Sequence, residues 1–236
     1  MSDRPPCRLS IYFASEKPRA VILRRGPTRN VCMIEWNTKT DTFKDGQWVK
    51  HRVYEEKCDL STDSKHFAYF GFSDHQSHGQ MTGGFAAVSE VPYFTALAIL
   101  VEGSTWGHGG RFVDRHHVLC PYLHNDGVPP LPAPLRWVWH PNAFGVARDQ
   151  APPSRDVRPT HFVLSSGKAA SIQPAALKRF LEAWPPVPKA PVLPKWCTVE
   201  DGCLYRIGPK GRRILLKDFN AMEFEAIEAP YSGVVI

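Results

Sequence analysis

The chain has 236 residues, of which 43% are hydrophobic and 22% are charged. This composition is typical of a globular protein that buries its own core without disulfides or a structural metal. The 22 prolines exclude a long helical bundle or coiled coil, because proline breaks the interior of a helix. The formal net charge of +6 permits anionic partners, but the basic residues fall in short, separate groups outside any known nucleic-acid module. Nucleic acid is therefore not an expected partner.

Short apolar runs bounded by turn residues predict β-strands through the first two thirds of the chain. The predicted strands cover 20–24, 31–36, 43–48, 52–54, 66–72, 85–91, 94–101, 111–119, 136–140 and 161–165. Loops are predicted at 74–84, which is rich in His, Gly and Ser, and at the proline-rich stretch 127–134. One short helix is predicted near 174–184, because Pro174 suits a first helical turn and the apolar residues after it share a face.

Prolines at 185–195 form a stiff linker of the polyproline type, and strand signals resume after it. Those strands are predicted at 198–199, 203–207, 213–217 and 224–227. A segment of this length would make a marginal core alone, so 196–236 is expected to dock on the rest as one domain, 1–236. The predicted fold class is all-β.

Neither a secretory signal nor an apolar run long enough for a membrane span occurs in the sequence, which predicts a cytoplasmic protein without a membrane partner. The six cysteines are too widely spaced for a zinc knuckle or a disulfide scaffold and are expected to be free thiols. His116, His117 and His124 lie near Asp114 and Asp126 but lack a metal-ligand spacing, so no metal or other cofactor is expected.

Two aromatic segments are candidate binding sites. Glycines surround Trp106 and His108, so this loop either presents an indole and an imidazole to a ligand or is a structural loop that needs positive φ angles. Trp137 and Trp139 lie on the same side of a predicted strand. Such a pair builds core or anchors an interface, and both interpretations stay open.

An Asp-containing turn followed by a strand occurs three times, in CDLSTDSKHFAYF (58–70), FVDRHHVLC (112–120) and VEDGCLYRI (199–207). The first resembles the LSPDGK turn of TolB-type and WD-like β-propeller blades, with Thr62 and Ser64 in place of Pro and Gly. This resemblance implies propeller-like antiparallel sheets, about five blades for this length. The segments PRAVILRRGP, YEEKCDLS and LLKDFNAMEFEAIEAPY also resemble a bacterial protein family, a resemblance that implies no activity.

The function predicted from these features is a protein-binding module. The chain resembles single-domain immunity proteins, which implies a toxin partner such as a type VI secretion effector. The expected contact is an acidic strip of Glu223, Glu225 and Glu228 beside Phe224 and Tyr231, facing a basic cleft. The net charge of +6 repels a basic partner at long range. Attraction between the acidic strip and the partner would therefore have to act within a Debye length. The alternative is a histidine-dependent or metal-dependent hydrolase with its site around 103–124.

Overall fold

The computed structural model consists mainly of β-strands. It describes residues 5–26, 30–73, 83–101, 105, 109–119, 128–139, 163–164, 168, 170–182 and 192–234. In this part of the chain, strands form four sheets, which we name A to D in chain order, and one α-helix is present. The predicted all-β class is therefore confirmed.

Sheets A and B come from the first hundred residues. Sheet A is an antiparallel meander of β1 (Arg8–Phe13), β2 (Arg19–Arg25), β3 (Val31–Asn37) and β4 (Thr42–Val49). Sheet B contains β5 (Arg52–Val53), β6 (Asp59–Leu60), β7 (His66–Ser73), β8 (Gly83–Glu90) and β9 (Ala96–Val101), with β5 and β6 both paired to β7. Short polar turns at 14–18 and 38–41 join β1 to β2 and β3 to β4, which is the hairpin pattern expected for antiparallel sheets.

Sheets C and D are smaller. Sheet C contains β10 (Arg111–Phe112), β11 (His117–Leu119), β12 (Arg136–Trp139) and β13 (Val163–Leu164), and its β11–β12 pair is parallel. Helix α1 (Pro174–Glu182) packs near sheet C, where Leu177 and Phe180 join a small apolar cluster. Sheet D is an antiparallel meander of β14 (Cys197–Glu200), β15 (Cys203–Ile207) and β16 (Arg213–Asp218). Short 3-10 turns occur at Glu55–Lys57 and Pro209–Gly211.

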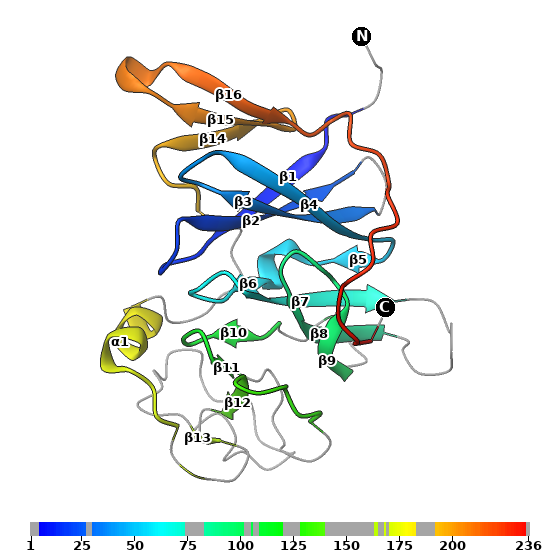
Figure 1. Cartoon of the computed structure of the whole chain (residues 1–236), viewed down its shortest axis with the longest axis vertical. Helices are drawn as coiled ribbons and strands as arrows, with labels where there is room; N and C mark the ends of the chain where they lie inside the picture. The colour runs from blue at the N-terminus through cyan, green and yellow to red at the C-terminus, as the bar shows by residue number, and fades with distance from the viewer. Residues whose placement is uncertain are drawn as a thin grey trace.

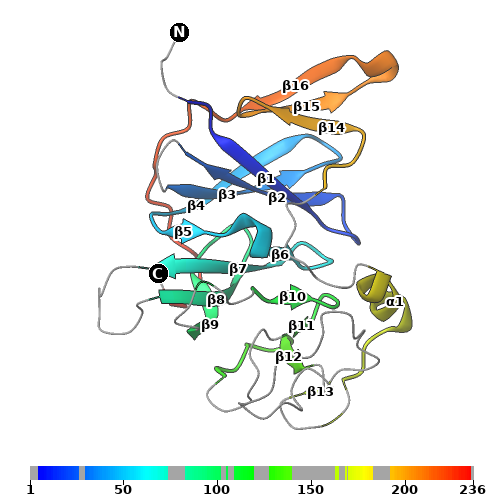
Figure 2. The ribbon, with the colours of Figure 1, turned by 180° about the vertical axis from the view of Figure 1, so that it is seen from behind.

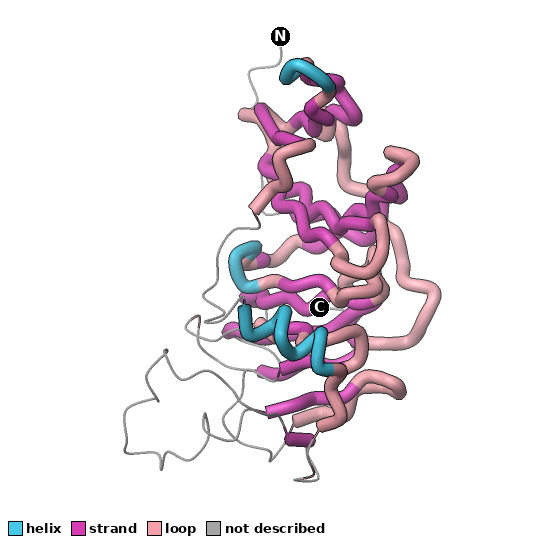
Figure 3. The backbone as a smooth tube through the Cα atoms, turned by 90° about the vertical axis from the view of Figure 1, so that its left-hand side faces the viewer, coloured by secondary structure: helices cyan, strands magenta, loops and turns pink. Residues whose placement is uncertain are grey.

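The sheets stack face to face in the order D, A, B, C along the long axis of the molecule (Figures 1 and 2). A separate apolar cluster fills each of the three layers between neighbouring sheets. The side view shows the same succession of strands, with α1 lying across one flank (Figure 3). Sheet D is the last sheet in the sequence, yet it packs on sheet A, which is the first.

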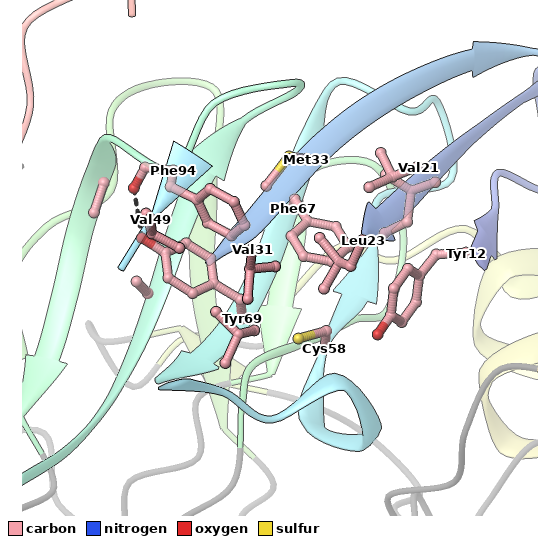
Figure 4. Packing of buried hydrophobic residues seen from close by; sticks show 14 of the residues in the cluster. Tyr12, Val21, Leu23, Val31, Met33, Val49, Cys58, Phe67, Tyr69 and Phe94 are labelled. Carbon is pink, nitrogen blue, oxygen red and sulfur yellow. Dashed lines mark hydrogen bonds between the residues drawn. The ribbon is translucent and has the colours of Figure 1, made fainter. Parts of the chain in front are cut away.

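The layer between sheets A and B is rich in large side chains (Figure 4). Phe67, Tyr69 and Phe94 are fully or almost fully buried there, facing Leu23 and Met33 from sheet A. The Tyr69 hydroxyl donates a 2.5 Å hydrogen bond to the carbonyl of Phe94. Burial of a large apolar side chain contributes about 1.5–3 kcal/mol, so this layer holds the two sheets rigidly together.

After sheet D the chain runs back past sheet A to sheet B, and we call Phe219–Val234 the C-terminal strap. In Figure 1 the strap descends on the right. It begins at Phe219, which is fully buried between sheets D and A. Its end is fixed by paired backbone hydrogen bonds of 2.8 Å between Val234 and Ala96.

Several sequence predictions need correction. The predicted strand 111–119 is two short strands around a turn, because the Asp114 carboxylate accepts hydrogen bonds from the backbone N–H groups of His116 and His117. The strand predicted at 224–227 is irregular chain within the strap, and β1 was not predicted. Most of the proline linker lies outside the described residues. No ring of sheets closes among the described residues, so the propeller and its number of blades stay predictions.

Candidate functional site

The LSTDSK turn forms one wall of a groove between sheets A and B. Asp63 Oδ1 accepts hydrogen bonds from the Ser61 hydroxyl at 2.9 Å and from the Lys65 backbone N–H at 3.2 Å. The Ser61 hydroxyl oxygen also accepts from the backbone N–H groups of Lys65 and His66. These bonds close the turn tightly and place Ser64 at φ +65°, a conformation uncommon for residues other than glycine. The turn therefore presents Ser64 and the residues around it in a fixed geometry.

The opposite wall comes from the turn between β1 and β2 and from neighbouring strands. Glu16 donates its backbone N–H to the carbonyl of Thr62 at 2.8 Å, which ties the two turns together. An ion pair joins Arg19 to Glu35. The groove has a volume of about 520 Å³ and is lined by Lys17, Arg19, Glu35, Asp63, Ser64, Lys65, His66, Glu90 and Val91.

This corner concentrates buried polar atoms that have no hydrogen-bond partner. Among the described residues five such side-chain atoms occur, and four of them are Thr62 Oγ1, Ser64 Oγ, His66 Nδ1 and Ser89 Oγ. Ser64 and His66 line the groove themselves, and Thr62 and Ser89 are the neighbours of lining residues in the chain. The four atoms themselves are covered, and a buried polar group without a partner costs about 1–3 kcal/mol, so this corner lowers the stability of the fold.

His66 is uncharged at neutral pH. Burial lowers the pKa of its imidazole, and the positive charge of Lys65 and the neighbouring His116 act in the same direction, whereas Asp63 opposes them. A neutral imidazole carries one donor and one acceptor nitrogen. His66 therefore adds no charge to the groove, whose charged lining consists of Lys17, Arg19, Lys65, Glu35, Asp63 and Glu90.

The C-terminal strap contains most of the site residues predicted from the sequence. Glu223, Glu225 and Glu228 are exposed, and the Phe224 side chain is 44% exposed. The Phe224 ring lies 6.1 Å from the Trp48 ring, and Lys50 Nζ lies 4.4 Å from its centroid. The predicted acidic strip with an aromatic residue therefore exists as an exposed surface, although no observation tests whether it binds anything.

Tyr231 has a structural role in the strap. Its hydroxyl donates to the carbonyl of Thr95 at 2.7 Å and accepts from the backbone N–H of Glu90 at 3.1 Å. Burial raises the pKa of this phenol to about 12, so it stays protonated. Tyr231 therefore anchors the end of the strap beside the groove residue Glu90.

The structure places the other predicted residues differently. Trp106 and His108 lie outside the described residues. Trp137 is buried between sheets B and C and donates its indole N–H to the carbonyl of Pro129 at 2.9 Å, which favours the core interpretation. Trp139 lies at the end of β12, and its backbone pairs with Val163.

A histidine–carboxylate pair lies in sheet C. His117 Nδ1 lies 2.9 Å from Asp114 Oδ2, and both side chains are largely buried. Burial raises the pKa of the Asp114 carboxyl, but the hydrogen bonds from His117 and the backbone outweigh burial and lower the pKa overall. The carboxylate thus orients the imidazole, an arrangement that general-base catalysis uses.

Within the described ranges, no group of three or more His, Cys, Asp or Glu side chains is arranged to hold a metal ion. No helix in this part of the chain is long and apolar enough to cross a membrane. In comparisons with known proteins, no family model, no curated protein and no solved structure matches the chain.

Sequence reasoning missed the groove. It noted the turn around Asp63 for its resemblance to propeller blades, but it did not bring Ser64 or His66 together with Lys17. The one usable signal was the same turn, where Thr62 and Ser64 replace the Pro and Gly of the LSPDGK pattern. Those two replacements supply two of the unpartnered hydroxyls.

Proposed function

We propose that the chain is a protein-binding module and that the C-terminal strap is its main contact surface. The observation that carries this proposal is Phe224, whose aromatic side chain is 44% exposed and which lies between the exposed Glu223 and Glu225. Aromatic anchors of this kind dominate the energy of protein interfaces when a partner covers them. The strap is fixed on both sides of Phe224, by Phe219 and by Tyr231. A partner would therefore meet an ordered surface and would pay little ordering entropy.

The proposed partner is a basic protein. Glu223, Glu225 and Glu228 give the strap a local negative charge, which complements a basic cleft at short range. A bacterial toxin, such as a type VI secretion effector whose cleft holds phosphates, fits this description, and the chain would then act as its immunity protein. An interface of about 1,600 Å² is enough for a specific complex. A propeller-like stack of sheets, about five blades in the proposed full fold, would serve as the rigid support.

Affinity capture with paired variants tests this function. Tagged wild-type protein, the Phe224→Ala variant and the triple Glu223, Glu225 and Glu228→Lys variant are each exposed to lysate of the source cell, and bound proteins are quantified by mass spectrometry. The proposal expects one basic protein that the wild type enriches and both variants lose. An exposed control, Lys210→Gln, should retain it. Equal recovery of every protein by wild type and variants would reject the strap as the contact surface.

The alternative function, a histidine-dependent hydrolase, is favoured by one observation, the pair of Asp114 and His117. In such an enzyme Asp114 would hold the His117 ring through Nδ1, while the second ring nitrogen, Nε2, takes a proton from water. Turnover of chromogenic ester and phosphodiester substrates that is lost in His117→Gln would support it. Turnover that survives this substitution would rule out the pair as its cause.

A further inference from the structure

The outer edge of β16 has no neighbouring strand among the described residues. Sheet D has the order β14-β15-β16, and it lies at one end of the stack of sheets (Figure 1). Every second residue of an antiparallel edge strand points its backbone N–H and C=O groups away from the sheet. Ile214 and Leu215, which are neighbours in this strand, are 46% and 54% exposed. β16 therefore offers both backbone hydrogen-bonding groups and apolar contact area to a further strand.

The charge of this edge decides which kind of strand it accepts. Arg212, Arg213 and Lys217 outnumber Asp218, the one acidic residue of β16. Arg213 and Lys217 are paired with carboxylates of the same chain, and Arg212 is exposed. Two β16 edges placed side by side would bring these cations together, and charges on an edge strand prevent such pairing. An acidic strand is attracted to the same edge, because opposite charges on neighbouring strands stabilise a sheet.

The chain itself carries an acidic segment with the alternation of a strand, residues 223–228 (EFEAIE), which we call the strap segment. No described strand pairs with it. Among the described residues, its backbone makes one hydrogen bond to backbone, from the Ile227 N–H to the carbonyl of Glu225 at 3.0 Å. Every residue of the segment except Ile227 is exposed. The strap segment therefore combines exposed backbone, an exposed aromatic side chain and three glutamates.

The strap segment is held away from β16 of its own chain. The centroid of the Phe224 ring lies 6.1 Å from that of Trp48 in β4, and Tyr231 fixes the end of the strap to the carbonyl of Thr95. The segment therefore runs along the flank of sheets A and B, whereas β16 lies at the end of the stack (Figure 1). In this arrangement the strap segment and the edge of β16 can meet only between two copies of the chain.

We propose that the chain associates with a second copy of itself by strand addition, in which the strap segment of one copy pairs with the outer edge of β16 of the other. In an antiparallel arrangement the glutamates at the two ends of the segment lie beside Arg212 and Lys217, and Phe224 covers aliphatic side chains of β16. The inference goes beyond the proposed function, because it needs no other protein. It makes the second copy a competitor of the basic partner for the strap.

Sedimentation equilibrium of the purified protein alone tests the proposal. Between about 10 and 500 µM protein, the average mass should rise above that of one chain, because an interface of this small size binds weakly. Raising the salt concentration should lower the mass, since salt screens the attraction between the two surfaces. Amide hydrogen exchange in β16 should slow as the mass rises, because strand addition pairs the N–H groups that point away from sheet D.

Charge-reversal variants identify the two surfaces. The strap-reversed variant carries Glu223, Glu225 and Glu228→Lys, and the β16-reversed variant carries Arg212→Glu and Arg213→Glu. Each variant alone should associate at least about tenfold more weakly than wild type, because it places like charges on both sides of the contact. An equal mixture of the two should associate again, since both contacts between the two variants then join opposite charges.

A matched control separates the local contact from the net charge of the chain. Lys39→Glu with Lys178→Glu changes the net charge by the same amount as the β16-reversed variant, at two exposed positions outside both surfaces. This control should associate as wild type does. Recovery in the mixture also shows that the charge-reversal variants are folded, because mixing does not repair a chain that has failed to fold.

Four results would overturn the proposal: a single-chain mass over the whole concentration range, undiminished association of either charge-reversal variant, a mixture that stays monomeric, or association that leaves exchange in β16 unchanged. The outcome is separate from that of the proposed function. A wild type that associates but captures no basic protein would reject the proposed function alone. A monomeric wild type that captures such a protein through the strap would reject the strand addition alone.

Discussion

The side chain of Gln47 in β4 joins sheet A to sheet B. It is 8% exposed, and its Oε1 accepts hydrogen bonds from the backbone N–H groups of Phe94 and Thr95, both at 2.7 Å, and from the Thr95 hydroxyl at 3.1 Å. Gln47→Leu keeps a side chain of similar size but leaves two buried backbone donors without an acceptor. At about 1–2 kcal/mol for each donor, the free energy of unfolding should fall by about 3 kcal/mol.

Urea unfolding followed by tryptophan fluorescence measures this loss. The same substitution at the exposed Gln173 is the matched control and should change the free energy of unfolding by less than about 0.5 kcal/mol. Thr95→Val removes only the hydroxyl donor, so its loss of free energy of unfolding should lie between those of Gln47→Leu and the Gln173 control. A loss below about 1 kcal/mol for Gln47→Leu would show that this oxygen does not hold the two sheets together.

Three further predictions concern other contacts. Burial lowers the pKa of His51 to about 4 from an ordinary value of 6.5. The unfolded chain therefore binds a proton first, and urea titrations should show stability falling as pH drops from 6.5 toward 4, by as much as about 3 kcal/mol, with a weaker fall in His51→Phe. Gly46→Ala should lower stability by about 2 kcal/mol in thermal melts, because its new Cβ would meet the carbonyl oxygen of Pro92. Arg24→Met removes hydrogen bonds to the carbonyls of Phe219 and Asn220, so limited proteolysis should cut the strap faster than in wild type.

Much of the strand pattern could be predicted because it is local. Apolar runs such as 20–24 and 66–72 lie inside β2 and β7, and turn residues mark their limits. β1 was missed because it follows a charged and proline-containing start, and it is an edge strand with an exposed first residue. The segment 224–227 alternates like a strand, yet it pairs with none of the strands in the described part of the chain and follows the flank of the sheets instead.

The strip on the strap could be predicted because its residues are neighbours in the sequence. The groove could not, because Lys17, Ser64 and Glu90 meet only when sheet A packs on sheet B. That packing depends on buried side chains spread over the first hundred residues. A local pattern carries no information on which turns meet across such a layer, although it does show that the turn at Asp63 is tight.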